Sequence, residues 1–443
     1  MKKTIIIGLI GIMAFAGSAT AQNSINLPYS QFGIGSSDMP YNLPIATRMG
    51  GAVYTRSGNN YVNPFNPASY GGIEKESFVF DMGFNVQLNT QHTGDNSLYD
   101  ANGNLAYLTL GMPITKWWKL AGGLMPFSSV SYNSVTTQKD TSTYGTMNTR
   151  YQGQGGVSQV FIGSAFNIPA WKGASLQAGF NVNYLTGRIQ RTISYEFADN
   201  TVSHWVNSRR LKESKLSNVL FDFGLQLRQA LGENYTLGLG ITYKPYQDMK
   251  VADNALIYTY DAISEQLIDT IFPAQGQAVG FDSRLEQFQT FGIGISLERN
   301  KRWQVAADAT LSAGNGLQYT EDEEHNIFGQ SALHNGPYSR TAIGFERMGN
   351  MDASTYWGRI SWSLGAHMEH GSMHLTLDGT DHRVDAWGVG VGMSLPMRKG
   401  RSLLTLSAGY NNYGSSDVLM RESVTFGIAV SSCERWFAKR KYN

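Results

Sequence analysis

The feature that most constrains the fold is a two-residue alternation of apolar and polar side chains, which recurs from residue 77 onward. Along a strand, successive side chains point to opposite faces, so each such segment has one apolar and one polar face. The polar face is rich in Gly, Asn, Thr, Gln and Ser and poor in charge. Many repeats of this pattern are typical of a barrel with lipid outside and a polar lumen inside. The clearest apolar face, within residues 77–89, consists of Phe78, Phe80, Met82, Phe84, Val86 and Leu88.

The N-terminus predicts export. Lys2 and Lys3 precede an apolar run over residues 5–16, and residues 19–21 (Ala-Thr-Ala) supply small side chains for cleavage, so residues 1–21 read as a secretory signal peptide. No other stretch approaches the ~18 continuous apolar residues that a spanning helix requires. A chain that enters a membrane without such helices must close its sheet, because unpaired backbone groups are too costly in lipid.

The strand candidates and their links support a barrel over residues 77–443. Short links such as 169–173 alternate with long ones such as 189–215, as expected for periplasmic turns and extracellular loops. We therefore predict an all-β chain, a fourteen-stranded antiparallel transmembrane β-barrel in the outer membrane of a Gram-negative bacterium, with both termini in the periplasm. The candidates are residues 77–89, 104–113, 119–132, 154–168, 174–188, 216–229, 235–245, 287–299, 302–312, 339–347, 356–368, 385–395, 402–411 and 422–433.

Aromatic residues cluster beside the short links and at the C-terminal end. Trp and Tyr favour the headgroup zone of a membrane, where the ring is sheltered and the polar atom stays wet. The cluster therefore predicts a girdle at the periplasmic interface. Its members are Trp117, Trp118, Trp171, Tyr235, Trp303, Tyr356, Trp357, Trp436 and Phe437.

Two regions depart from the alternation. Residues 22–76 carry many Gly, Pro and Asn residues and predict irregular backbone with one short helix near 43–49, either a flexible tail or a plug in the lumen. The third strand contains Gly122, Gly123 and Pro126, which predict either an inward kink that opens the wall or a harmless bulge.

The sequence gives little indication of catalysis, metal binding or nucleic-acid binding. The single Cys433 excludes a disulfide within the chain, and 35 basic against 34 acidic residues leave no basic surface for nucleic acid. We find no catalytic elbow or triad spacing, so we expect neither an enzyme nor a cofactor. A cluster of histidines and carboxylates could ligate a metal ion, although a solvated polar loop is the alternative and no metal is expected. The cluster consists of His367, Glu369, His370, His374, Asp378, Asp381 and His382.

Several short segments, in their order along the chain, resemble the FadL-type outer-membrane transporters of hydrophobic compounds. The sharpest are residues 49–53 (Met-Gly-Gly-Ala-Val) followed by Asn66, Pro67 and Ala68. Residues 113–117, 123–128, 155–157 and 435–441 are also similar to family segments. The resemblance implies that residues 22–76 form an N-terminal hatch, with the Asn-Pro-Ala motif inside it, that plugs a fourteen-stranded barrel.

The resemblance also implies a mechanism. A hydrophobic ligand would enter from outside, reach a pocket near the hatch and leave sideways through a kink in the third strand at Gly122, Gly123 and Pro126. Arg48 and Arg56 are the candidate contacts for a ligand carboxylate. The leading hypothesis is therefore a passive transporter of small hydrophobic molecules such as fatty acids or aromatic compounds. The alternative is a barrel subunit of a larger outer-membrane secretion or assembly complex that transports nothing. Both hypotheses imply membrane lipid as a partner.

Overall fold

The computed structural model describes most of the chain after the expected signal peptide. The predictions for residues 1–21, Trp436 and Phe437 lie outside the described residues. The described ranges are 28–31, 33–36, 43–93, 96–140, 145–197, 206–261, 264–272, 279–299, 302–314, 316–320, 333–371, 373–377, 380–397, 402–415 and 419–435.

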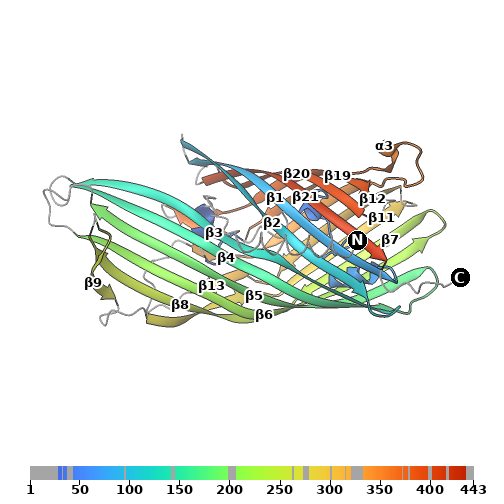
Figure 1. Ribbon diagram of the computed structural model, residues 1–443, viewed down its shortest axis with the longest axis horizontal. Coiled ribbons are helices and arrows are strands. Elements are labelled where there is room, and N and C mark those ends of the chain that lie inside the picture. The colour runs from blue at the N-terminus through green and yellow to red at the C-terminus, as the bar shows by residue number, and fades with distance from the viewer. Residues whose placement is uncertain are drawn as a thin grey trace, which may run out of the picture.

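The strands form a closed antiparallel barrel with fourteen positions in its wall (Figure 1). Closure is direct, because the first strand pairs with the last, from Ser77↔Arg435 to His92↔Met420. Two wall positions are each divided: β7 continues as β8, and β10 continues as β11. The wall consists of β1 (Ser77–Thr93), β2 (Asn96–Pro113), β3 (Trp118–Asp140), β4 (Gly145–Ile168), β5 (Ala174–Phe197), β6 (Asn207–Leu231), β7 (Tyr235–Lys244), β8 (Gln247–Tyr260), β10 (Val279–Gln287), β11 (Thr290–Arg299), β12 (Trp303–Ser312), β15 (Ser339–Arg347), β16 (Ser361–His370), β19 (Ala386–Met397), β20 (Ser402–Ser415) and β21 (Leu419–Arg435).

Smaller elements complete the fold. β9 (Leu267–Phe272) and β13 (Leu317–Thr320) extend the main sheet, and β14 (Leu333–Asn335), β17 (Met373–Leu377) and β18 (Thr380–Arg383) form a separate small sheet. The helical elements are η1 (Pro28–Gln31), α2 (Pro44–Thr47), η3 (Pro67–Gly72) and α3 (Tyr356–Arg359). Among the described residues, no helix is both long and apolar enough to cross a membrane.

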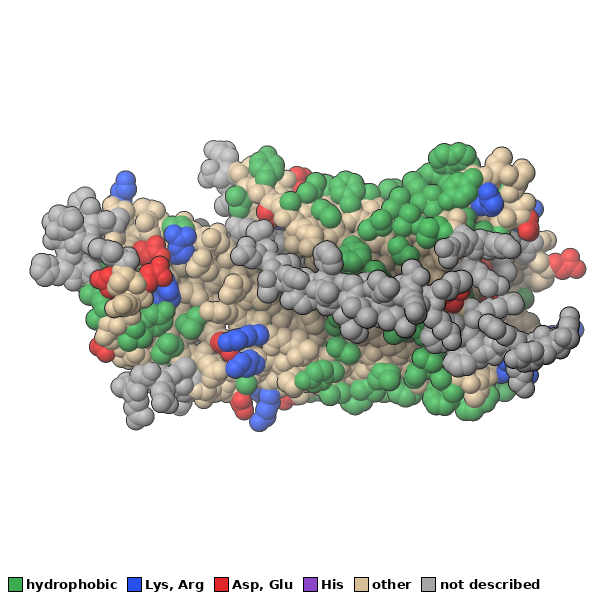
Figure 2. All heavy atoms as spheres, viewed as in Figure 1, with side chains coloured by type: hydrophobic (Ala, Val, Ile, Leu, Met, Phe, Trp, Pro, Cys, Tyr) green, Lys and Arg blue, Asp and Glu red, His purple; other side chains and the backbone are tan. Residues whose placement is uncertain are grey.

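The outward face carries the apolar side chains that the alternation predicts. Phe221, Phe223 and Leu225 on β6 are 44–46% exposed. Gly224 and Gln226 alternate with them along the strand and face the interior. Ile293 and Val391 repeat the pattern on other strands. On the face drawn in Figure 2, exposed hydrophobic side chains gather along the part of the barrel nearer the short turns. The fold class is therefore confirmed, and hydrocarbon is the solvent that fits this face.

The predicted strands are too short at the long-loop end. Residues 133–153 and 189–215 were expected to be loops, but β3 runs to Asp140, β4 begins at Gly145, and β5 and β6 extend similarly. Residues 246–286 likewise contain β8, β9 and β10. These parts project beyond the apolar belt and carry outward ion pairs such as Lys250–Asp282. With water outside them, no apolar side chain is required at every second position, so the alternation that marked the other strands is weak here.

Two smaller differences concern the short-turn end. The candidate strand 356–368 begins with the helix α3 instead, and β16 starts only at Ser361. The described aromatic residues of the predicted girdle are largely exposed there; Trp357, for example, is 70% exposed and stacks on Trp362 at 6.5 Å between ring centroids. This arrangement suits a membrane interface, where flat amphipathic rings are stable.

Candidate functional site

Residues 43–73, here called the inner segment, line the inside of the barrel wall. Its short helix α2 agrees with the helix expected near 43–49. Inward-facing glycines on eleven strands approach it so closely that a β-carbon on any of them would overlap it. A β-carbon on Gly344 would lie 2.7 Å from the Met49 carbonyl oxygen, and one on Gly179 would lie 2.5 Å from the Pro67 carbonyl carbon. These glycines, here called the glycine ring, are Gly111, Gly163, Gly179, Gly224, Gly240, Gly292, Gly294, Gly344, Gly365, Gly390, Gly392, Gly409 and Gly427.

The order of these contacts shows the path of the inner segment. Pro44 meets β21, Thr47 meets β20 and β19, and Met49 meets β16 and β15. Farther along, Tyr54 meets β11 and β7, and the remaining residues continue through β6, β5 and β4 to Ile73 against β2. The segment therefore follows the inner wall once around the barrel. Because glycine has no side chain, the inner segment packs directly on the strand backbone, through its own backbone at Gly179, Gly240, Gly344, Gly365 and Gly390 and through its side chains at the other glycines.

Asn66, Pro67 and Ala68 lie within this path. The Asn66 side chain accepts a hydrogen bond from the Ala68 N–H (3.1 Å) and donates one to the Tyr54 carbonyl (2.7 Å). It therefore caps η3, where Pro67 fits the first helical position, and ties it to an earlier turn of the inner segment. The side chain is fully buried. This gives the Asn-Pro-Ala motif a structural explanation that needs no ligand.

Replacing Asn66 with Ala should destabilise the barrel by about 2 kcal/mol, because a buried N–H and a buried carbonyl lose their partners. The free energy of unfolding in urea, measured in lipid vesicles, checks this. Asn59→Ala is the matched control, because the Asn59 side chain bonds Glu74 at an exposed position. Equal stability of the two variants would contradict the role assigned to Asn66.

Arg48 and Arg56 converge on one carboxylate. Glu346 of β15 forms ion pairs with Arg48 (2.8 Å) and Arg56 (2.9 Å), and all three side chains are at most 8% exposed. Burial lowers the pKa of Arg48. Burial would also lower the pKa of Arg56, but attraction to Glu346 outweighs it and that pKa is raised. Sequence reasoning identified the two arginines but missed Glu346, because no local signal links residues 298 positions apart.

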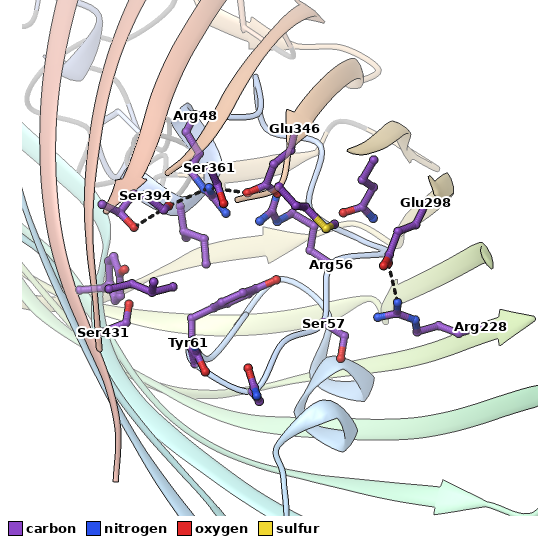
Figure 3. Close-up of a pocket in the computed structure, with 18 residues that line it drawn as sticks. Arg48, Arg56, Ser57, Tyr61, Arg228, Glu298, Glu346, Ser361, Ser394 and Ser431 are labelled. Carbon is purple, nitrogen blue, oxygen red and sulfur yellow. Dashed lines mark hydrogen bonds and ion pairs between the residues drawn. The ribbon is translucent and has the colours of Figure 1, made fainter. Parts of the chain in front are cut away.

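These residues line the inner cavity, a space of about 190 Å³ on the short-turn side of the inner segment (Figure 3). Its wall residues, among them Arg228, Glu298 and Ser431, all lie near the short-turn ends of their strands. Tyr61 of the inner segment closes one side.

The outer cavity, about 280 Å³, lies on the long-loop side of the same segment. Tyr54 and Phe65 form its floor, Met125 and Phe127 of β3 form one wall, and Leu317 is among the long-loop residues around it. Its lining is mixed, with apolar and aromatic side chains beside a few charges. The glycine ring lies between this cavity and the inner cavity.

The third strand has a bulge on one side and departs from its neighbour on the other. Its register with β4 shifts between Pro126 and Ser128. Its pairing with β2 covers only six residues, Leu108↔Leu124 to Pro113↔Lys119. Gly122 and Gly123 lie within the paired part, so the strands separate after Leu124 at the Pro126 bulge and not at the glycines.

Part of the unpaired edge of β3 is covered by the chain itself. Ser36 and Ser129 exchange two backbone hydrogen bonds of 2.9 and 3.0 Å, and Ser128 Oγ donates to the Ile34 carbonyl at 2.8 Å. The edge of β2 has no such cover in the described part of the chain: residues 101–107 pair with β1 alone.

The predicted cluster of histidines and carboxylates is divided between different places. His367 and His370 are apart, His374 and His382 lie on the paired strands β17 and β18, and Asp378 lies outside the described residues. The side chain of His367 is directed into the lumen beside Gly388, whereas His370 contacts Asp385 and Arg383 on the long-loop side. In the ranges that the structure describes, no group of three His, Cys, Asp or Glu side chains is arranged to hold a metal.

Comparison with known proteins places this chain in a family. The family model BamG matches residues 1–443. The chain belongs to the BamG family. The search of curated proteins finds no match. The FadL-type resemblance read from the sequence is confirmed at the level of the fold, and BamG is a family of FadL-like barrels.

Solved structures with this fold include three named transporters or homologues. A Pseudomonas aeruginosa FadL homologue has 13% identity and a TM-score of 0.52, covering 91% of this chain and 99% of its own. The Pseudomonas putida toluene transporter TodX has 13% identity and a TM-score of 0.52 (89% and 98% covered). The Ralstonia pickettii toluene transporter TbuX has 12% identity and a TM-score of 0.50 (88% and 97% covered). Together with the lipid-facing belt, this fold identifies the BamG-family chain as an outer-membrane barrel.

Proposed function

We propose that this protein is a passive outer-membrane channel for small hydrophobic molecules, which leave the barrel sideways between β2 and β3. The observation that carries the proposal is the position of the outer cavity. Met125 and Phe127, which line it, flank the Pro126 bulge where β3 separates from β2. The toluene transporters TodX and TbuX share the fold and suggest the class of ligand.

A sideways exit fits the geometry of the inner segment. The close contacts between the glycine ring and the inner segment leave little room for passage straight through the lumen. An apolar solute that leaves sideways enters hydrocarbon directly, which avoids about 0.8 kcal/mol for each CH₂ exposed to water. On this route residues 22–76 act as the hatch and the Pro126 bulge parts the strands, while Gly122 and Gly123 lie in the last paired residues before the opening.

The ligand proposed here is a neutral hydrophobic molecule. Arg48 and Arg56 line the inner cavity, on the other side of the glycine ring from the outer cavity. A fatty acid held in the outer cavity would therefore not reach them. Uptake of labelled toluene and of a labelled long-chain fatty acid, in a deletion strain and its complemented parent, tests the proposal. Loss of toluene uptake on deletion is expected, and unchanged uptake of both compounds would overturn it.

Enlarging one side chain of the outer cavity should slow transport. Met125→Trp is expected to lower toluene uptake about tenfold, because the larger ring fills the space beside the bulge and a pocket discriminates at this scale. Ile293→Trp is the matched control, since Ile293 is 60% exposed on the lipid face. Surface amounts of both variants are compared by immunoblot. An equal effect of the two substitutions would count against the outer cavity as the route.

The unpaired edge of β2 favours a second candidate function. The protein would then be a subunit of a larger outer-membrane complex, with both termini in the periplasm. Ala101, Gly103 and Leu105 pair with Leu88, Val86 and Phe84, and these three β1 residues are 45–47% exposed on the lipid face. The edge therefore lies at hydrocarbon depth, where an unpaired backbone group costs several kcal/mol. A strand from a neighbouring protein would satisfy it.

A photo-crosslinking amino acid at Leu105 should therefore form one discrete protein adduct in intact cells, whereas the same residue at Ile293 should form none. Mild detergent extraction and native sizing should show a species larger than the monomer that is lost in a Leu105→Pro variant. A monomer in every detergent, with only lipid adducts at Leu105, would exclude this second function.

A further inference from the structure

A third cavity, here called the outward pocket, lies on the outer face of the barrel wall beyond the apolar belt. Side chains of β4, β5, β6 and β8 and of the turn before β9 line it, at the long-loop end of the barrel (Figure 1). On β6 the lining residues Asn207 and Arg209 share a face with the lipid-facing Val219 and Phe221, because β6 pairs with β5 without a register shift between them. The volume of the outward pocket, about 540 Å³, exceeds those of the inner and outer cavities.

The charges that line the outward pocket cancel. They belong to two arginines (150 and 209) and two glutamates (196 and 265), so the formal charges of +2 and −2 leave no excess of either sign. The carboxylate of the neighbouring Asp261 is engaged within its own turn, where it accepts hydrogen bonds from the N–H and the hydroxyl of Ser264. An ionic ligand would meet attraction and repulsion at similar range, so an uncharged ligand suits this lining best.

The polar side chains of the outward pocket hold one another in place. Arg150 Nε donates a hydrogen bond to Glu196 Oε1 (3.4 Å), and the Asn207 side-chain oxygen accepts one from the Phe197 N–H (3.0 Å). Asn207 is only 6% exposed although it lies on the outer face. In the described part of the chain, each bond uses one atom of a forked group. The terminal nitrogens of Arg150, the second oxygen of Glu196 and the NH₂ group of Asn207 are therefore left for a ligand, already positioned.

Forked groups of this kind match neighbouring hydroxyl groups. A sugar hydroxyl both donates and accepts hydrogen bonds, and a planar guanidinium, carboxylate or amide can bond two adjacent hydroxyls at once. Phe197, which is also in the lining, supplies apolar surface for the C–H groups of a sugar ring. A volume of about 540 Å³ lies within the range of small-molecule sites and accommodates a short oligosaccharide.

We propose that the outward pocket binds an uncharged saccharide. It lies beyond the hydrocarbon, at the end of the barrel that the long links predict to be extracellular, which is the level of the sugar headgroups in the outer leaflet. The source is either such a headgroup on a membrane glycolipid or a free oligosaccharide. The pocket faces away from the lumen, so this site is independent of the proposed hydrophobic transport.

Saturation-transfer NMR of the purified full chain in detergent micelles tests the proposal. The neutral probes are maltotetraose, mannotetraose, chitotetraose and the neutral saccharide fraction released by mild acid from the membrane glycolipid of the same bacterium. Tetragalacturonate and the chitosan tetramer are the acidic and cationic counterparts. We expect binding of at least one neutral probe. Strongest binding of the released fraction identifies the glycolipid as the source, and strongest binding of a tetraose identifies a free oligosaccharide. Binding of no neutral probe, or tighter binding of a charged tetramer than of every neutral one, would overturn the proposal.

Two variants locate the site. Arg150→Met keeps the length of the side chain but removes its donors, and it should weaken saccharide binding about tenfold. Arg188→Met is the matched control, because Arg188 also forms an outward ion pair with a glutamate of the next strand, Glu213, but does not line the pocket. Gln152→Leu removes an amide from the lining without breaking an ion pair and should also weaken binding. Heat-dependent gel mobility checks that all three variants are folded. Equal binding by Arg150→Met and Arg188→Met, or full binding by Gln152→Leu, would show that the saccharide binds elsewhere.

Salt provides a separate check that the ligand is uncharged. The affinity for the best neutral probe should change by less than about twofold between ~0.05 M and ~0.5 M salt, because no net charge is screened on binding. A steep fall in affinity over this range would contradict the balanced lining.

Discussion

Gly365→Ala should destabilise this barrel by about 3 kcal/mol or more, although it adds a single methyl group. A β-carbon at Gly365 would overlap the Met49 carbonyl group and lie 2.5 Å from the Gly50 nitrogen. Those atoms are backbone, so no side-chain rotation relieves the overlap. Gly50 in turn has a φ of +60° and its own close approach to Ala366, so the inner segment has little freedom to shift away.

Neighbouring strands make the effect larger than one contact suggests. Gly344, Gly365, Gly390 and Gly409 are paired side by side across β15, β16, β19 and β20. They form a flat inner surface over which residues 47–50 run. A methyl group anywhere in this row raises the inner segment from its neighbours as well, so packing and hydrogen bonds are lost over several residues.

The measurement is urea unfolding in lipid vesicles, with heat-dependent gel mobility as a test for the folded barrel. Gly103→Ala is the matched control, because a β-carbon there would have its nearest neighbour, the Asn85 carbonyl oxygen, at an ordinary 3.7 Å. Its stability should equal that of the parent within about 0.5 kcal/mol. If both glycines tolerate alanine, the inner segment is held less closely than the glycine ring indicates.

The parts of this fold that could be predicted from the sequence are the strands that cross the lipid. There, the surrounding hydrocarbon requires an apolar side chain at every second residue. Hydrocarbon requires apolar side chains at Phe221, Phe223 and Leu225, and the register of β6 follows from them. No such requirement acts on residues 133–140 or 207–215, which lie beyond the apolar belt, so the strand ends there were missed. Aromatic residues beside short turns could be predicted because the membrane interface itself selects them.

Less of the candidate site could be predicted from the sequence, because the site depends on which strands face each other across the lumen. The alternation marks Gly388, Gly390 and Gly392 as lumen-facing, but only barrel closure reveals that Thr47 and Arg48 lie against two of them. Lumen-facing positions can carry any polar side chain, so the frequent glycine at these positions is itself a signal that another segment packs closely against them. Similarly, the function of Arg48 depends on Glu346, and no local pattern connects a coil residue to a distant strand.

Glu346→Gln should be among the most damaging single substitutions in the lumen, at about 3–5 kcal/mol. It preserves the shape of the side chain but leaves Arg48 and Arg56 buried without their shared carboxylate. The two guanidinium groups would then also repel each other in a site that water reaches poorly. Urea unfolding in vesicles at neutral pH and low salt measures the loss.

Arg56→Gln is the informative comparison, because it changes the net charge in the opposite direction. It leaves Arg48 and Glu346 as a balanced pair at 2.8 Å, and its cost should be near 1 kcal/mol, well below that of Glu346→Gln. Adding Arg56→Gln to Glu346→Gln should restore part of the stability, because one of the two uncompensated cations is removed. A simple salt bridge predicts similar losses from either side. Two arginines that share one glutamate predict this asymmetry, so equal losses in the two single variants, with no recovery in the double variant, would contradict the central position of Glu346.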